Sequence, residues 1–197
     1  TAINGGTVST TGAQTYNDAV TLGTATTIFG VSNTFASTVN GSFALTVNDS
    51  GTTTFSSAVG GTTALVSLTT DTGGTTAVNG GTVSTTGAQT YNDAVTLGTG
   101  ATIFGLSNTF ASTVNGSGGL TVNDSGTTTF SSAVGGTTAL ASLTTDTGGT
   151  TAVNGGTVST TGAQTYNDVV TLGTATTISG VSNTFASTVN GSFALTV

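Results

Sequence analysis

The chain has 197 residues and contains no Lys, Arg, His, Cys, Met, Trp or Pro; its seven acidic residues give a net charge of −7. A chain without cationic side chains cannot displace counterions from phosphates, which disfavours nucleic acid and anionic lipid as partners. No apolar run is long enough to span a bilayer, so we expect no membrane insertion. The absence of Cys excludes a disulfide framework.

The chain is a tandem repeat whose copies agree nearly letter for letter. Residues 1–75 form repeat 1, residues 76–150 form repeat 2, and residues 151–197 are a partial repeat 3. A fixed period predicts stacked units, each packing on its neighbours, and one continuous array without separate globular domains. Because the chain begins without Met and stops within a period, we expect it to be a segment of a longer array.

A shorter period lies inside the large one. A Thr-aromatic pair followed by Val occurs at Tyr16 and Val20, at Phe35 and Val39, and at Phe55 and Val59. A degenerate fourth copy without the aromatic ends in Val78, and the next unit reaches Val95. Turn-forming Asn-Gly and Gly-Gly pairs follow most of these valines. The pattern predicts four sub-repeats, each of about 19 residues, in every full repeat.

These segments are predicted to be short strands. Gly and β-branched residues are abundant, no apolar stripe of helical period is present, and alternation is clear at Phe43, Leu45 and Val47. A β-sandwich with antiparallel hairpins is one possible arrangement. We favour an all-β, right-handed parallel β-helix (a β-solenoid) with about 19 residues per coil and four coils per repeat, since like residues then stack in columns.

The solenoid interpretation predicts which side chains form buried columns. Successive valines make one column and successive aromatic residues make another. The residues expected in these structural core columns are Tyr16, Val20, Leu22, Ile28, Phe35, Val39, Leu45, Val47, Phe55, Val59, Val78, Tyr91, Val95, Phe110, Val114, Phe130, Val134, Tyr166, Val170, Phe185 and Val189.

Differences between the copies indicate which aromatic residues face outward. Phe29 becomes Ser179 in the third copy, and emptying a packed aromatic site costs about 3–5 kcal/mol. We therefore expect Phe29 and Phe104 at the surface. Phe43 becomes Gly118, which indicates an outward position, yet its alternation with Leu45 indicates an inward one. A position at a roomy corner would agree with both observations.

The residue types for catalysis are missing. No His, Cys, Lys or Glu is present to act as base or nucleophile, and the Asp residues of one unit occupy different phases of the predicted coil. With equivalent Asp residues four coils apart, the carboxylates would lie about 19 Å from one another on the solvated surface. We expect no enzyme activity and no catalytic residues; an enzyme would have to lose its activity on an Asp18→Asn change.

No cofactor or metal site is expected either. The glycine-rich calcium-binding repeat lacks its second Gly and its Asp here, at Gly5-Gly6-Thr7. Weak calcium binding at Asn48/Asp49 or Asn17/Asp18 is an alternative to a turn-capping role for these residues. An ice-binding face is a remote alternative, since the column Thr15, Thr34 and Thr54 is broken in the fourth coil.

The stretch Thr10–Gly23, together with the short coil period, resembles the β-strand repeat tracts of large bacterial surface proteins, the filamentous-haemagglutinin-like and autotransporter-type adhesins. The resemblance implies a secreted β-helical shaft at the bacterial cell surface or in the biofilm matrix. We expect a structural protein that forms a fibre, with itself as partner, end to end or as a longer covalent array. The alternative is a ligand-binding adhesin whose Thr/Asn-rich face or Phe29 contacts glycans or cells.

Overall fold

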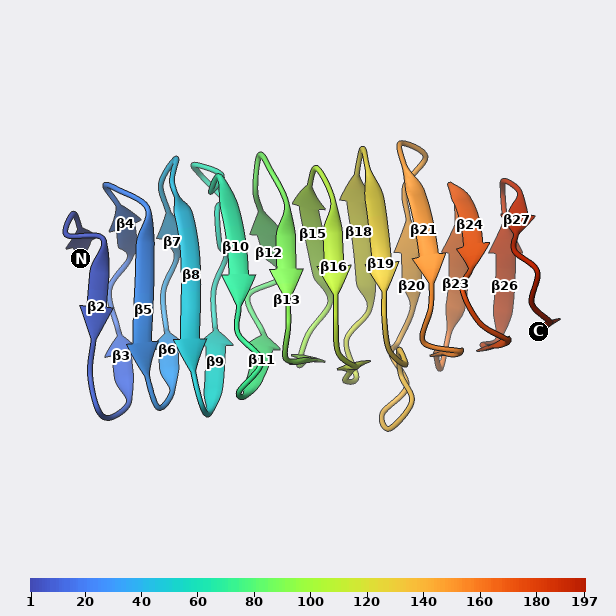
Figure 1. The fold of residues 1–197 in the computed structure, drawn as a ribbon, viewed down its shortest axis with the longest axis horizontal. Coiled ribbons are helices and arrows are strands. Elements are labelled where there is room, and N and C mark those ends of the chain that lie inside the picture. Colours follow the sequence, from blue (N-terminus) through green and yellow to red (C-terminus); the bar gives the residue numbers. More distant parts are fainter.

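A computed structural model, which describes all 197 residues, shows a rod of stacked coils (Figure 1). Every secondary-structure element is a β-strand, every strand pair is parallel, and the strands run across the long axis with the two chain ends at opposite ends of the rod. Each coil passes through three faces in the order A, B and C. The expected all-β parallel solenoid is confirmed, and Tyr16 pairs with Phe35 one coil later, as the short period predicts.

Face B is one continuous sheet of ten strands and lies in front in Figure 1. Its strands are β2 (Thr7–Ser9), β5 (Thr26–Gly30), β8 (Ala44–Asp49), β10 (Ser67–Thr70), β13 (Gln89–Tyr91), β16 (Asn108–Phe110), β19 (Thr127–Phe130), β21 (Thr150–Val153), β24 (Val169–Leu172) and β27 (Val189–Asn190).

Face A consists of a three-stranded and a six-stranded sheet joined by single bridges at Val59. Its strands are β1 (Ala2–Ile3), β4 (Val20–Leu22), β7 (Val39–Asn40), β12 (Thr82–Ser84), β15 (Ala101–Gly105), β18 (Leu120–Asp124), β20 (Leu143–Thr145), β23 (Ala163–Tyr166) and β26 (Ser182–Phe185).

Face C is divided in the same way, with single bridges at Val134. Its strands are β3 (Gln14–Tyr16), β6 (Asn33–Phe35), β9 (Thr52–Phe55), β11 (Thr75–Val78), β14 (Ala94–Leu97), β17 (Val114–Asn115), β22 (Thr157–Ser159), β25 (Thr176–Ser179) and β28 (Leu195–Thr196).

The hydrophobic core fills the inside of the rod as one cluster of Val, Leu, Ile, Phe and Tyr side chains. Alternation along each strand explains it, because every second side chain of a strand faces inward. Of the residues expected in the core columns, Tyr16, Phe185 and Val189 are half-buried and the others are buried.

Aromatic rings stack face to face along the axis. The centroids of Tyr16 and Phe35 are 5.0 Å apart, and those of Phe35 and Phe55 are 5.2 Å apart. The same ladder recurs at Tyr91, Phe110 and Phe130. The spacing follows from the separation of paired strands, about 4.8 Å, so the backbone ladder sets the ring separation.

The fourth coil departs from the expected register. Val59 bridges to Val83, and Val78 pairs with Phe55 and so continues the aromatic column. Val95 pairs with Thr76 on face C. Leu45 pairs with Leu68, a larger offset than between Tyr16 and Phe35, because a long connection follows β9. Four whole coils per repeat is therefore wrong.

One repeat contributes the ten strands β1–β10 and the bridge at Val59, which makes eleven strand positions. Each complete coil has three positions, one on each face. Eleven positions therefore make three complete coils and two of the three faces of a fourth. Equivalent residues consequently rotate by one face per repeat: Val8 lies on face B, Val83 on face A and Val158 on face C.

Corners are closed by glycine where the chain makes its closest approaches. Gly41 has φ of 136°, and a Cβ built there would lie 2.5 Å from the carbonyl oxygen of Leu22 in the preceding coil. Leu22 pairs with Ile3 one coil earlier, so Gly41 ends that apolar column with a turn. All positive φ angles of the chain belong to Gly.

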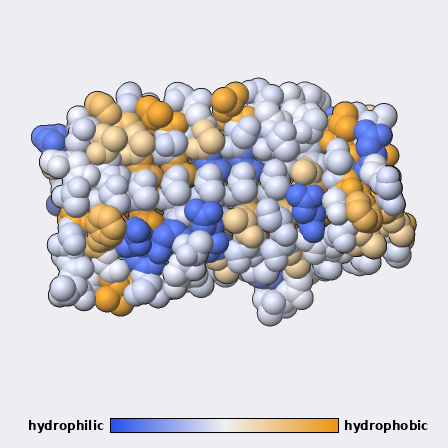
Figure 2. All heavy atoms as spheres, in the orientation of Figure 1, coloured by the Kyte–Doolittle hydropathy of each residue, from blue (hydrophilic) through white to orange (hydrophobic).

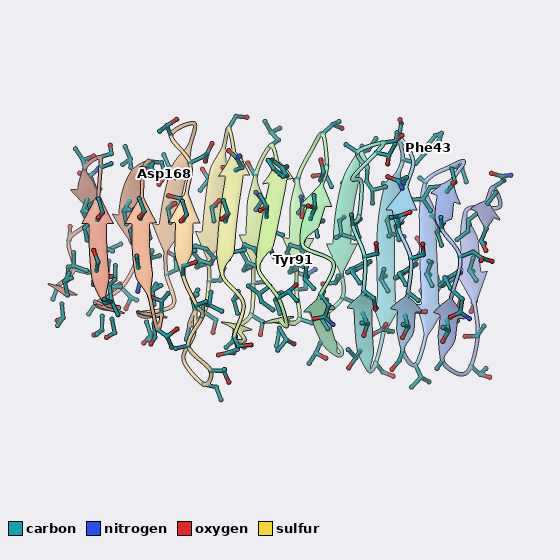
Figure 3. All side chains as sticks on the ribbon, turned by 180° about the vertical axis from the view of Figure 1, so that it is seen from behind. Phe43, Tyr91 and Asp168 are labelled. Carbon is teal, nitrogen blue, oxygen red and sulfur yellow. The ribbon has the colours of Figure 1, made fainter.

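The surface of the rod is dominated by residues of intermediate hydropathy, with scattered polar and apolar patches (Figure 2). Phe29 and Phe104 are 38% and 37% exposed, as expected from the copy differences, whereas the neighbouring Ile28 and Ile103 are buried. Phe43 is also 38% exposed and precedes β8, so it lies at a corner and not in the inward alternation (Figure 3).

Replacing a ring inside the aromatic ladder should destabilise the rod far more than replacing a surface ring. We expect Phe110→Ala to lower the free energy of unfolding by about 3–5 kcal/mol, because Phe110 is buried between Tyr91 and Phe130. The matched control, Phe104→Ala, should cost less than about 1 kcal/mol. Urea unfolding followed by circular dichroism measures both; equal losses would contradict the assignment of the ladder to the core.

Candidate functional site: the acidic corner

Three Asp residues lie at the same corner of the rod in consecutive coils. Asp49 ends β8, Asp71 follows β10, and Asp93 follows β13, all where the chain turns from face B to face C. These three strands are consecutive in the face B sheet. The expectation of widely separated carboxylates is therefore wrong, because the longer fourth coil brings Asp71 into phase with the other two.

The acidic corner recurs in the second repeat. Asp124 ends β18, Asp146 follows β20 and Asp168 follows β23, where the chain turns from face A to face B. Asp168 is labelled in Figure 3. The rotation of the repeat moves the corner to another edge of the rod. Adjacent coils lie about 4.8 Å apart, which is within the screening length of about 8 Å, so these carboxylates repel one another even in salt.

Four of the carboxylates are buried, contrary to the expected solvated positions. Asp49 and Asp93 are 2% and 3% exposed, and their copies Asp124 and Asp168 are 4% and 5% exposed. Asp18, the first-repeat equivalent of Asp93, is exposed. A buried carboxylate requires hydrogen-bond donors to compensate for lost hydration.

Threonine hydroxyl groups supply the donors to Asp93. The Oγ1 atoms of Thr70 and Thr76 each donate to Asp93 Oδ1 at 2.8 Å, and Thr76 also reaches Oδ2 at 3.0 Å. Thr145 and Thr151 donate to Asp168 in the same way. Both carboxylate oxygens of Asp93, and both of Asp168, therefore accept hydrogen bonds inside the corner.

Asp49 is held differently. Its Oδ2 accepts hydrogen bonds from Asn33 Nδ2 at 2.8 Å and from Thr53 Oγ1 at 2.7 Å, while its backbone N–H donates to Asp71 Oδ1 at 3.3 Å. Its Oδ1 is buried and has no partner. The copy at Asp124 repeats the pattern with Asn108, Thr128 and Asp146, and Asp124 Oδ1 is again unpaired.

Burial changes the proton affinity of this corner. Desolvation raises the pKa of Asp93; the hydrogen bonds from Thr70 and Thr76 oppose this shift, and the nearby charge of Asp71 adds to it. Desolvation likewise raises the pKa of Asp124, against the hydrogen bonds from Thr128 and Asn108, with Asp146 adding to the shift.

A second polar group lies inside the rod beside each corner. The Tyr91 hydroxyl donates to Gln89 Oε1 at 2.7 Å, and Gln89 Nε2 donates to the carbonyl oxygen of Phe104 at 2.8 Å. Burial raises the pKa of the Tyr91 phenol, with the charge of Asp93 adding to the shift. The Gln-Thr-Tyr spacing, which puts Gln and Tyr on the same side of a strand, carried the signal for this pair.

A surface cavity of about 300 Å³ lies along the first acidic corner. It is lined mostly by polar residues: Thr10, Phe29, Gly30, Asn48, Asp49, Ser50, Asp71 and Gly73. Nowhere in the chain do three His, Cys, Asp or Glu side chains converge closely enough to hold a metal ion between them.

The other sequence-derived features are placed as follows. Thr15, Thr34 and Thr54 stack in one column, and Ala77 ends it. The structure has no helix with the length and hydrophobicity that a membrane crossing requires. Comparison of the chain with family models, curated proteins and solved structures finds no match.

The raised pKa of Asp93 predicts an unusual dependence of stability on pH. A carboxyl group with a raised pKa binds its proton more tightly in the folded than in the unfolded chain, so stability falls as pH rises from the unfolded pKa through the folded one. We expect the thermal midpoint to rise on acidification from pH 7 to about pH 4. Asp93→Asn should raise the midpoint at pH 7 and weaken the pH dependence.

The control is Asp18→Asn, which removes the same charge from an exposed position. It should leave the pH dependence of the thermal midpoint unchanged. A midpoint that falls on acidification, in the starting protein and in Asp93→Asn alike, would contradict the assignment of the pH dependence to Asp93.

Proposed function

We propose that the chain is a structural repeat protein that forms the shaft of an extracellular bacterial filament or surface fibre. The observation that carries the proposal is the continuity of the stack across repeat boundaries. β9 of repeat 1 pairs with β11, and β10 pairs with β13, in parallel, as the coils inside a repeat also do. Adding repeats therefore lengthens one rod, which is the property that a shaft requires.

The interior and the exterior support the same function. Parallel backbone ladders and the stacked rings of Phe110 and Phe130 bind each coil to the next along the axis, while Thr and Ser side chains cover much of the outside. The unpaired edges of the outermost coils, β1–β3 and β26–β28, can continue the ladder with a further repeat or with a second copy of the chain. The partner in this proposal is the chain itself.

The proposed location is supported by composition and by the resemblance to repeat tracts of large bacterial surface proteins. Without Lys or Arg the chain offers no site to trypsin-like proteases, and without Cys or Met it offers no sulfur to oxidants. Both properties suit a material exposed outside the cell. The proposed role is mechanical and involves no catalysis.

Rod length should grow in equal steps as repeats are added. One repeat spans three coils and two further faces, which corresponds to about 18 Å of rod at about 4.8 Å per coil. We expect chains of two, four and six repeats to increase in length in proportion to this step in small-angle scattering and electron micrographs. Fibre diffraction should show an axial spacing of about 4.8 Å. Independently folded repeats on flexible linkers would show neither and would contradict the shaft.

Antibodies against the repeat test the location and the role together. Applied to intact cells that produce the full protein, they should label extended filaments outside the cell, and a chain shortened by whole repeats should give shorter filaments. Labelling only after the cells are permeabilised would exclude the extracellular shaft. A denaturing gel of the isolated filaments separates one covalent array, which migrates as a very large species, from stacked subunits near 18.7 kDa.

An adhesive role is the second candidate, favoured by the neighbouring exposed side chains of Phe29 and Val31. Aromatic rings at a surface suit stacking on sugar rings. Specific, saturable binding of the rod to glycan arrays, abolished by Phe29→Ser, would support the adhesin. The serine variant is matched, since Ser179 occupies the equivalent position in repeat 3. If no such binding is found, the shaft is the only one of the two candidate functions that remains.

A further inference from the structure

The first acidic corner contains a carboxylate oxygen that accepts no hydrogen bond. Asp49 lines the surface cavity, and its Oδ2 is engaged by Asn33 and Thr53 inside the rod. Its Oδ1 is buried and has no hydrogen-bond partner. A buried carboxylate oxygen without a partner is costly, because it has lost its hydration and gains no hydrogen bond in return.

The same corner holds more negative charge than the chain can balance. Asp71 lies at the cavity one coil further along, with its Oδ1 at 3.3 Å from the backbone nitrogen of Asp49. Asp93 follows in the next coil. The chain has no Lys, Arg or His, so no side chain can pair with these carboxylates. Positive charge at this corner must come from solution.

We propose that the Asp49–Asp71 corner, and its copy at Asp124–Asp146, each bind one calcium ion. Asp49 Oδ1 and the Asp71 carboxylate supply the charged ligands, and the polar residues Asn48, Ser50 and Thr10 line the same cavity. Oxygen-only ligands, two carboxylates and room for water fit Ca²⁺, which accepts six to eight oxygens in flexible geometry. The smaller Mg²⁺ demands near-ideal octahedral geometry and fits less well.

The second corner repeats the hydrogen-bond pattern of the first, although the surface cavity is found only at the first corner. Asp124 Oδ1 is unpaired and Asp146 Oδ1 accepts from the Asp124 backbone N–H, as at Asp49 and Asp71. In contrast, Asp93 has both oxygens engaged by Thr hydroxyl groups and offers no free ligand. Of the two Asn-Asp pairs that the sequence suggested, only Asn48/Asp49 lies at the cavity, whereas Asp18 is exposed.

Calorimetric titration of the chain with CaCl₂ at pH 7, after removal of metal with a chelator, tests the proposal. We expect two calcium ions per chain, with dissociation constants of about 10⁻⁴ to 10⁻³ M, the range of sites with few charged ligands outside cells. The thermal midpoint should rise with calcium, and MgCl₂ at the same concentration should raise it less. The double variant Asp71→Asn/Asp146→Asn should weaken calcium binding at least tenfold.

The variants distinguish calcium binding at the two corners from an effect on folding and from general screening of the negative charges by salt. Asp71 and Asp146 are partly exposed, so their replacement should leave the circular dichroism spectrum unchanged. Asp18→Asn/Asp93→Asn removes two charges and should retain both calcium sites. The proposal is overturned if calcium gives no saturable heat at concentrations tenfold above the expected range, if this control pair loses binding equally, or if NaCl of equal ionic strength reproduces the midpoint shift. None of these outcomes bears on the shaft, which rests on coil stacking.

Discussion

The parallel backbone ladder along the axis is the interaction on which the rest of this structure depends. It holds successive coils at the separation of paired strands, and thereby fixes which residue lies above which. Rings that occupy the same phase must then stack, as Tyr16, Phe35 and Phe55 do. Carboxylates of the same phase must also stack, although they repel. The ladder turns a one-dimensional spacing in the sequence into a column, whether or not the column is favourable by itself.

Where the spacing is regular, the sequence predicted the column. Tyr16, Phe35 and Phe55 follow one another at nearly constant spacing, and the structure pairs them directly. The prediction failed at Val78, which was assigned to the valine column because it is the next Val in a similar sequence. A long connection between β9 and β10 shifts the register there, and Val78 pairs with Phe55 instead. That connection adds residues outside the ladder, and nothing in the alternation of the strands reveals how many of them leave it. The copied sequence could not help, since both full repeats carry the same connection.

The acidic corner was missed for a related reason. Considered alone, an Asp in a chain of Thr and Gly is expected at the surface. If every coil is given the same number of residues, Asp49, Asp71 and Asp93 also occupy different positions within the coil. The structure brings them together only through the longer coil. Their burial depends on donors from other strands: Thr70 and Thr76 for Asp93, Asn33 and Thr53 for Asp49. Most of these partners are distant in sequence, so they become visible only when the register is known.

The rotation of the repeat by one face has a mechanical consequence. A rod built from whole coils per repeat would place every long connection, acidic corner and exposed ring on one side, and that side would differ in stiffness from the others. Here the features of successive repeats occupy the three faces in turn, as Phe29 on face B and Phe104 on face A illustrate. In a rod with three full repeats, this rotation would distribute the same features over all three faces, and the resistance to bending would differ less between directions. Because Phe29 and Phe104 lie on different faces, the exposed rings of successive repeats do not form one continuous apolar row along the rod.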